Sequence, residues 1–190
     1  MREELAGRLL TLYSNNRSNE WRWFEQELSY CNAALSHALI VSRQMIPNVE
    51  IARVGIESLR WLTELQRPGG VTSHFVPIGS NGFYKRGGER ARFDQQPVEI
   101  QAMVSACIEA YRVTGDKQWR REAHRAFEWF HGRNDLHMPV YDATTGGCRD
   151  GLHSDRVNEN QGAESTLAFL QSLLELRLSE DALAAPEVRT

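Results

Sequence analysis

The stretch PVEIQAMVSACIEAYRVTGD, residues 97–116, decides the fold class. Pro97 suits the first position of a helix, and Thr114-Gly115-Asp116 forms a tight-turn signal at the other end. Between them, large apolar residues recur at helical spacing, and small residues form a second stripe beside them. The large residues are Ile100, Met103, Val104, Cys107 and Tyr111; the small ones are Ala102, Ala106 and Ala110. The pattern predicts a helix that is apolar on more than one side and therefore buried.

Apolar residues at the same spacing predict further helices on both sides of this one. They are expected over 5–12, 28–45, 51–65, 119–130 and 161–178. The segment 119–130 has one apolar face and one highly charged face, which indicates a surface helix. Leucines spread around most of the last segment instead, so that helix is expected to be buried.

The connections between these helices alternate between short and long. Short ones lie around Pro47 and at 114–116, and long ones cover 69–96 and 132–160. Long loops within a compact domain usually have a function. Short turns at one end and long loops at the other are typical of stacked helical hairpins in an α/α toroid. Two loop segments, 70–76 and 138–141, are expected to pair as short strands.

The sequence therefore predicts an all-α fold, a partial α/α toroid of about six to seven helices. A single domain is expected over residues 1–178, followed by a flexible tail over 179–190.

Composition excludes several classes of function. The 190 residues include 22 Lys and Arg against 25 Asp and Glu, a net charge of −3, so no basic field attracts nucleic acid or anionic lipid. No apolar run is long enough for a membrane helix, and the N-terminus is charged rather than signal-like. We expect a cytoplasmic protein without nucleic-acid or membrane partners.

The sequence contains no recognisable cofactor or metal motif. The three cysteines, Cys31, Cys107 and Cys148, form no CxxC pair, and no glycine-rich phosphate loop is present. Cys148 with Asp150 and His153 is too loosely spaced to favour a metal site. No cofactor and no metal are expected.

In a toroid, the N-termini of the buried helices open onto one funnel, and the residues there are carboxylates, amides and aromatics. Sugar sites use this mixture, since hydroxyls need polar partners and ring faces stack on aromatic side chains. The candidate catalytic residues are Asp94, Glu164 and Glu99. The candidate substrate-binding residues are Trp23, Tyr30, Asn32, Gln95, Gln96, Asp150, His153, Asn158, Asn160 and Gln161.

Several of these candidates have a structural alternative. Glu99 falls at the third position of its helix, where a carboxylate caps the helix and complements its dipole, and Glu164 is similar. Asn158 or Asn160 is a good N-cap. Trp23 has the alternative of an ordinary core aromatic.

Three motifs carry a resemblance to a known family: RGGERARFDQQP at 86–97, YDATTGGCRDGLH at 141–153 and VNENQGAEST at 157–166. The chain resembles a helical domain of the six-hairpin glycosidase-like superfamily. More specifically, it is similar to the helical region found C-terminal to bacterial group 1 (family 4-type) glycosyltransferase domains. The resemblance runs from about Trp21 to Leu176 and implies an α/α toroid with a role in carbohydrate metabolism.

A complete ring of this superfamily has about twice as many helices as this chain. The chain is accordingly part of a larger protein, a companion of a separate glycosyltransferase, or a half-ring completed by a second copy. An open half-ring would expose apolar helix flanks.

Three functions remain open. The first is a carbohydrate-active domain that acts on or binds a glycan or small sugar; as a hydrolase it would use Asp94 and Glu164 as the acid/base pair, with Glu99 as substitute. The second is a non-catalytic module that binds sugar or docks on a glycosyltransferase. The third is a sugar epimerase or isomerase, which needs two histidines, and only His74 and His153 are suitably placed. A raised carboxyl pKa would favour catalysis, whereas carboxylates engaged only in caps and arginine pairs would favour the module.

Overall fold

The computed structural model describes residues 1–67, 69 and 73–184, apart from the side chains of 181–184. The described residues confirm the all-α class. Their helices are α1 (Arg2–Asn16), α2 (Ala33–Ser42), α3 (Val49–Leu65), α4 (Pro97–Thr114), α5 (Lys117–Phe127) and α6 (Ala163–Ala184), with a short 3-10 helix, η1 (Glu128–His131), after α5. Two antiparallel strand pairs accompany them: β1 (Glu27–Leu28) with β2 (Tyr84–Lys85), and β3 (Gly151–Leu152) with β4 (Val157–Asn158).

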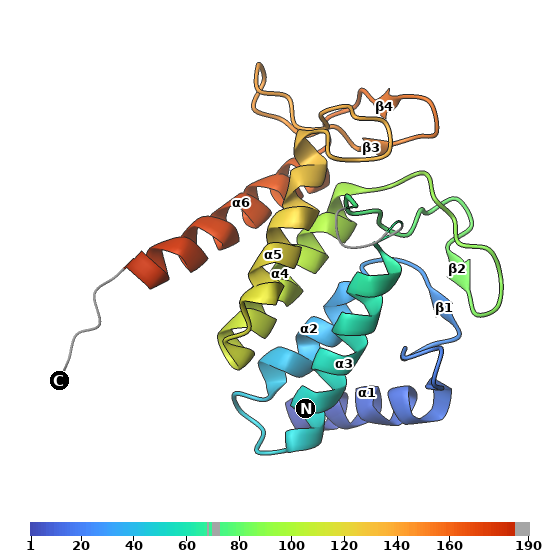
Figure 1. The fold of residues 1–190 in the computed structure, drawn as a ribbon, viewed down its shortest axis with the longest axis vertical. Helices are drawn as coiled ribbons and strands as arrows, with labels where there is room; N and C mark the ends of the chain where they lie inside the picture. Colours follow the sequence, from blue (N-terminus) through green and yellow to red (C-terminus); the bar gives the residue numbers. More distant parts are fainter. Residues whose placement is uncertain (68, 70–72, 185–190) are drawn as a thin grey trace.

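The helices α2, α4 and α6 form one layer in chain order, with α4 in the middle (Figure 1). Helix α3 packs against α2 and helix α5 against α4, so α2–α3 and α4–α5 are two helical hairpins. The three layer helices all begin at the same end of the molecule, where the long loops and the strands β3 and β4 gather (Figure 1). This end of the molecule is called the loop end below.

Helix α4 is the centre of the core, as its two apolar stripes predict. Both stripes are buried except for Tyr111, which is half-buried. Pro97 occupies the first turn, and Gly115 ends the helix with a left-handed φ of 69°. The Asp116 carboxylate then accepts the Gln118 N–H and caps α5. The predicted tight turn between the two helices is therefore confirmed.

Helix α6 differs from the prediction of a buried helix. Leu167, Leu170, Leu174 and Leu178 are 47–56% exposed and form one stripe along its side. Only α4 and α5 make substantial contacts with α6 among the described helices, and they cover its opposite face. One apolar side of α6 is therefore exposed among the described residues. The helix also continues to Ala184, past the predicted start of the flexible tail; residues 185–190 of that tail lie outside the described residues.

Two other features differ from the sequence-based prediction. Helix α2 begins at Ala33 rather than near Leu28, because Leu28 pairs in β1 and Cys31 has a left-handed φ of 52° that a helix cannot contain. The predicted pairing of 70–76 with 138–141 is not observed over residues 73–76; residues 70–72 lie outside the described residues. The Val76 N–H bonds to the Gln66 carbonyl instead.

Within the part of the chain that the structure describes, no helix is both long enough and apolar enough to cross a bilayer.

Candidate functional site

Residues at the start of α2, α4 and α6 meet at the loop end. The Tyr30 hydroxyl, just before α2, donates to Oε1 of Glu164 in the first turn of α6 at 3.0 Å. Glu99, in the first turn of α4, accepts the backbone N–H groups of Cys31 and Asn32 and the Asn32 side-chain amide at 3.2 Å. These five residues are called the Glu99–Glu164 rim below.

Glu99 has the most unusual environment in this rim. Its side chain is 4% exposed, and burial raises its pKa to about 7 against the lowering effect of the Cys31 and Asn32 hydrogen bonds. The carboxyl group is nevertheless fully engaged with the N-terminus of α2. Glu99 therefore fixes the Tyr30–Asn32 segment and is not itself open to a ligand.

Tyr30 and Glu164 form the exposed part of the rim. Tyr30 is 46% exposed, and burial together with the hydrogen bond to Glu164 raises its pKa to about 12. The tyrosine hydroxyl is therefore a stable donor at neutral pH.

A second group of polar residues surrounds a pocket of about 380 Å³. Oδ1 of Asp94 lies 2.5 Å from Nδ1 of His153, and both side chains are about one-third exposed. The rest of the lining is Asn81, Arg92, Phe93, Ser154, Asp155 and Arg156. This site is called the Asp94–His153 pocket below.

Backbone geometry aims Asp94 at this pocket. Asp94 has a left-handed φ of 55°, which aspartate tolerates better than most residues. The preceding residue, Phe93, packs so closely against Gly79 that an added Cβ on Gly79 would lie 1.9 Å from the Phe93 carbonyl oxygen. The close backbone contact between Gly79 and Phe93 therefore requires glycine.

Gln95 joins the two loops that form the pocket. Its backbone N–H and C=O both bond to Leu152, beside His153, at 3.0 and 2.9 Å. Its side chain is fully buried, donating to Asp135 and accepting the indole N–H of Trp129, each at 2.7 Å. Gln95, a sequence candidate for substrate binding, is thus a positioning residue without an exposed polar atom.

Asp135 is a site residue that the sequence analysis missed. It is almost fully buried and accepts hydrogen bonds from His74 and Arg92, both at 2.8 Å, and from Gln95. Burial alone would raise the pKa of Asp135, but the hydrogen bonds from Arg92, His74 and Gln95 hold it below its usual range. Nothing in its local sequence marks it, because its partners are 40 to 61 residues away along the chain.

The candidates between Asp150 and Gln161 mostly bond within their own loop. Asp150 accepts the Gly162 N–H at 2.8 Å and the Ser165 hydroxyl at 2.7 Å at the start of α6. Burial alone would raise the pKa of Asp150, but these two hydrogen bonds and one from Asn160 hold it below its usual range. The Asn158 side chain accepts the Asn160 N–H, and the Gln161 side chain bonds to Asp142 and Thr145.

Two further candidates are also placed. Gln96 is the N-cap residue of α4 but makes no capping hydrogen bond with its side chain. Trp23 is fully buried and its ring stacks on Trp61 at 5.9 Å, so it presents no face to a sugar. Trp23 is therefore a core aromatic, the structural alternative given above.

The proposed acid/base pair is divided between the two groups, since Asp94 bonds to His153 and Glu164 to Tyr30. None of the three candidate carboxylates pairs with Arg86, Arg90 or Arg92 among the described contacts. Those arginines bond to the Asn16 carbonyl, the Leu65 carbonyl and Asp135, respectively.

Among the described residues, no group of three or more His, Cys, Asp or Glu side chains is arranged to hold a metal ion. No protein-family model matches the chain. A comparison with curated proteins finds no significant match either.

Proposed function

We propose that this protein is a carbohydrate-active domain of the α/α-toroid type that binds a sugar in the Asp94–His153 pocket. The observation that carries the proposal is the Asp94–His153 pair at the wall of a polar pocket with one aromatic residue, Phe93. The two helical hairpins packed side by side support a ring-like arrangement, of which this chain would form an arc.

The composition of the pocket suits a sugar. Carboxylate, amide, hydroxyl and guanidinium groups can each exchange hydrogen bonds with sugar hydroxyls, and the Phe93 ring offers an apolar face. Its volume of about 380 Å³ lies within the range of small-molecule sites, roughly 300–1,000 Å³. The Tyr30–Glu164 pair would extend the polar surface at the same end of the molecule.

Sugar isomerisation or epimerisation is a second candidate, favoured by one specific observation. Each of two histidines is held by a carboxylate, His153 by Asp94 and His74 by Asp135. A carboxylate fixes the tautomer and orientation of an imidazole and strengthens it as a base. Arg92 connects the two pairs, since it bonds to Asp135 and also lines the pocket.

Binding is tested by thermal-shift and calorimetric titration with monosaccharides, oligosaccharides and nucleotide sugars. A ligand at one hundred times its dissociation constant stabilises the folded state by about 2.7 kcal/mol. We expect Asp94→Asn and His153→Gln to abolish the shift. The matched control is Glu3→Gln, which removes one exposed carboxylate from α1, away from the loop end. A sugar that stabilises all four proteins equally, or a complete set of sugars without effect, would refute the proposal.

Catalysis is tested with the same sugar in deuterated water. An isomerase or epimerase that transfers a proton through His153 incorporates solvent deuterium next to the sugar carbonyl, which NMR detects. We expect incorporation with the unaltered chain and none with His153→Gln. Sugar binding without deuterium exchange, and without hydrolysis of an oligosaccharide, would identify a binding module.

A further inference from the structure

A second cavity lies far from the loop end. It is an open groove of about 490 Å³ between α3, the α2–α3 connection and the last residues of α4, Val113 and Thr114. The Asp94–His153 pocket lies near the first residue of α4, and the 18 residues of this helix separate the two sites by about 26 Å. This cavity is called the α3 groove below.

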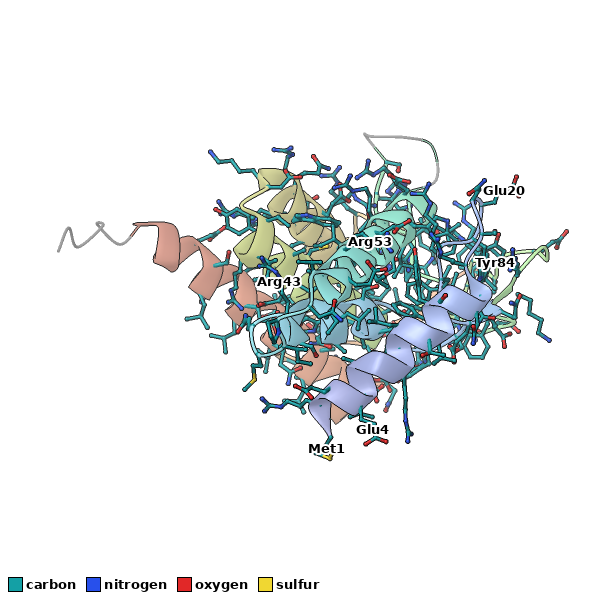
Figure 2. All side chains as sticks on the ribbon, turned by 90° about the horizontal axis from the view of Figure 1, so that it is seen from below. Met1, Glu4, Glu20, Arg43, Arg53 and Tyr84 are labelled. Carbon is teal, nitrogen blue, oxygen red and sulfur yellow. The ribbon has the colours of Figure 1, made fainter. Side chains whose placement is uncertain are left out.

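The rim of the α3 groove is basic. It contains Arg22, Arg43, Arg53 and Arg60 against the single carboxylate of Glu57, although the whole chain has a net charge of −3. Arg43 and Arg53 are labelled in Figure 2, which views the molecule from the end where α2 leads into α3. Basic charge is therefore concentrated at this groove in an otherwise acidic protein.

Two of these arginines are already engaged with carboxylates. Arg53 bonds to Glu50 and Glu57, each at 2.6 Å, and Arg22 lies 3.9 Å from Glu57. Glu57 is thereby shared between two guanidinium groups. Its single negative charge therefore does not neutralise Arg43 and Arg60 as well.

The other two arginines, Arg43 and Arg60, make no ion pair with any residue that the structure describes. Arg60 lies over the Trp119 ring at 5.9 Å, a cation–π contact that orients the guanidinium group. An arginine without a carboxylate partner can donate two parallel N–H hydrogen bonds to the oxygens of a phosphate group.

Apolar side chains also line the groove. Val49 is 86% exposed at the first turn of α3, and Ala52, Ile56 and Val113 line the groove beside it. Val49, Ala52 and Ile56 follow helical spacing, so they form one stripe along α3. An apolar stripe beside several arginines is complementary to a ligand that has an anionic head and an apolar body.

We infer that the α3 groove binds a small organic phosphate. The apolar body of this ligand lies over Val49 and Ile56, and its phosphate is bound by the rim, where Arg43 and Arg60 are the free donors. This second site is independent of the sugar proposed for the Asp94–His153 pocket, because it shares no residue with that pocket.

The test is calorimetric titration of the full chain with 1-naphthyl phosphate, 1-naphthol and inorganic phosphate. We expect 1-naphthyl phosphate to bind at least tenfold more tightly than either of the other two, since only it contains both features. Added salt should weaken this binding, because exposed charges are screened. Equal affinity for 1-naphthol, or no binding of 1-naphthyl phosphate, would overturn the inference.

Two double variants show whether binding depends on the arginines of the groove or only on the net charge of the protein. The double variant Arg43→Gln/Arg60→Gln should bind 1-naphthyl phosphate at least tenfold more weakly. The control double variant, Arg8→Gln/Arg133→Gln, removes the same two charges from exposed ion pairs elsewhere and should bind normally. Equal losses in both would show a general charge effect and overturn the inference.

A third variant, Val49→Ser, tests the apolar stripe without altering the charge. It changes an exposed side chain, so folding should be retained. It should weaken 1-naphthyl phosphate and leave inorganic phosphate unchanged. A glutamate-rich peptide that binds to the groove when 1-naphthyl phosphate does not would contradict the assignment to a small molecule.

Discussion

Replacing Glu99 by glutamine should remove a large part of the pH dependence of folding stability. Burial raises the pKa of this carboxyl from 4.5 to about 7, which corresponds to about 3 kcal/mol of differential free energy. The folded state therefore keeps the Glu99 proton at pH values where the unfolded chain has lost it. This contribution to stability is complete below pH 4.5 and is lost as the pH rises through 7.

Glutamine is uncharged at every pH and has the shape of the protonated acid, so Glu99→Gln has no such loss. The free energy of unfolding of the unaltered chain, minus that of the variant, should fall by about 3 kcal/mol between pH 4.5 and 8. Taking this difference removes the contribution of His37. Burial lowers the pKa of that histidine, which makes stability rise with pH up to 6.5.

The assay is urea denaturation at half-unit steps of pH, followed by tryptophan fluorescence. Glu3→Gln is the control, because it removes an exposed carboxylate from α1 and leaves Glu99 in place. A Glu99 difference curve that is flat to within about 0.5 kcal/mol would refute the reasoning. It would mean that the three N–H donors around the carboxylate fully offset the effect of its burial on the pKa.

Three further predictions follow from individual contacts. Gly79→Ala should destabilise the protein by about 3 kcal/mol or more, because the added Cβ would meet rigid backbone. Gly7→Ala has open space around it in helix α1 and should stabilise the protein by up to about 1 kcal/mol. Thermal melting checks both variants, and equal effects would contradict the packing argument. Gln95→Met should cost about 1–3 kcal/mol in urea denaturation, because the buried indole N–H of Trp129 loses its acceptor, and an unchanged midpoint would contradict this. Burial and the charges of Glu99 and Glu164 raise the pKa of Cys31 to about 11, so a chromogenic disulfide reagent at pH 8 should modify it much more slowly in the folded chain than in urea.

The Asp94–His153 pair shows where sequence analysis reaches its limit. Both residues are candidates on their own, as a loop carboxylate and a loop histidine, but they are 59 positions apart. Their contact depends on the backbone bonds between Gln95 and Leu152, which join two loops that have no local pattern in common. The same holds for Asp135, whose role comes entirely from distant partners.

Burial of individual side chains is a second limit. The leucines of α6 and the aromatic Trp23 are equally apolar in the sequence, yet Leu174 is 56% exposed and Trp23 is fully buried. Whether an apolar residue is covered depends on the presence of a neighbouring element. Helix α6 lacks one on its leucine side among the described residues.

The sequence by itself determined the all-α class, the buried character of α4, the turn at Gly115 and Asp116, and the length of the two loops. These features depend on periodicity, helix capping and backbone preferences, which act over a few residues along the chain. Only the tertiary structure decided that Glu99 serves the N-terminus of α2, that Asp94 meets His153, and that the arginines of the α3 groove outnumber their carboxylate partners. The physical reason is that a polar or charged side chain acquires its role from the partners and the burial that packing supplies, and those come from distant parts of the chain.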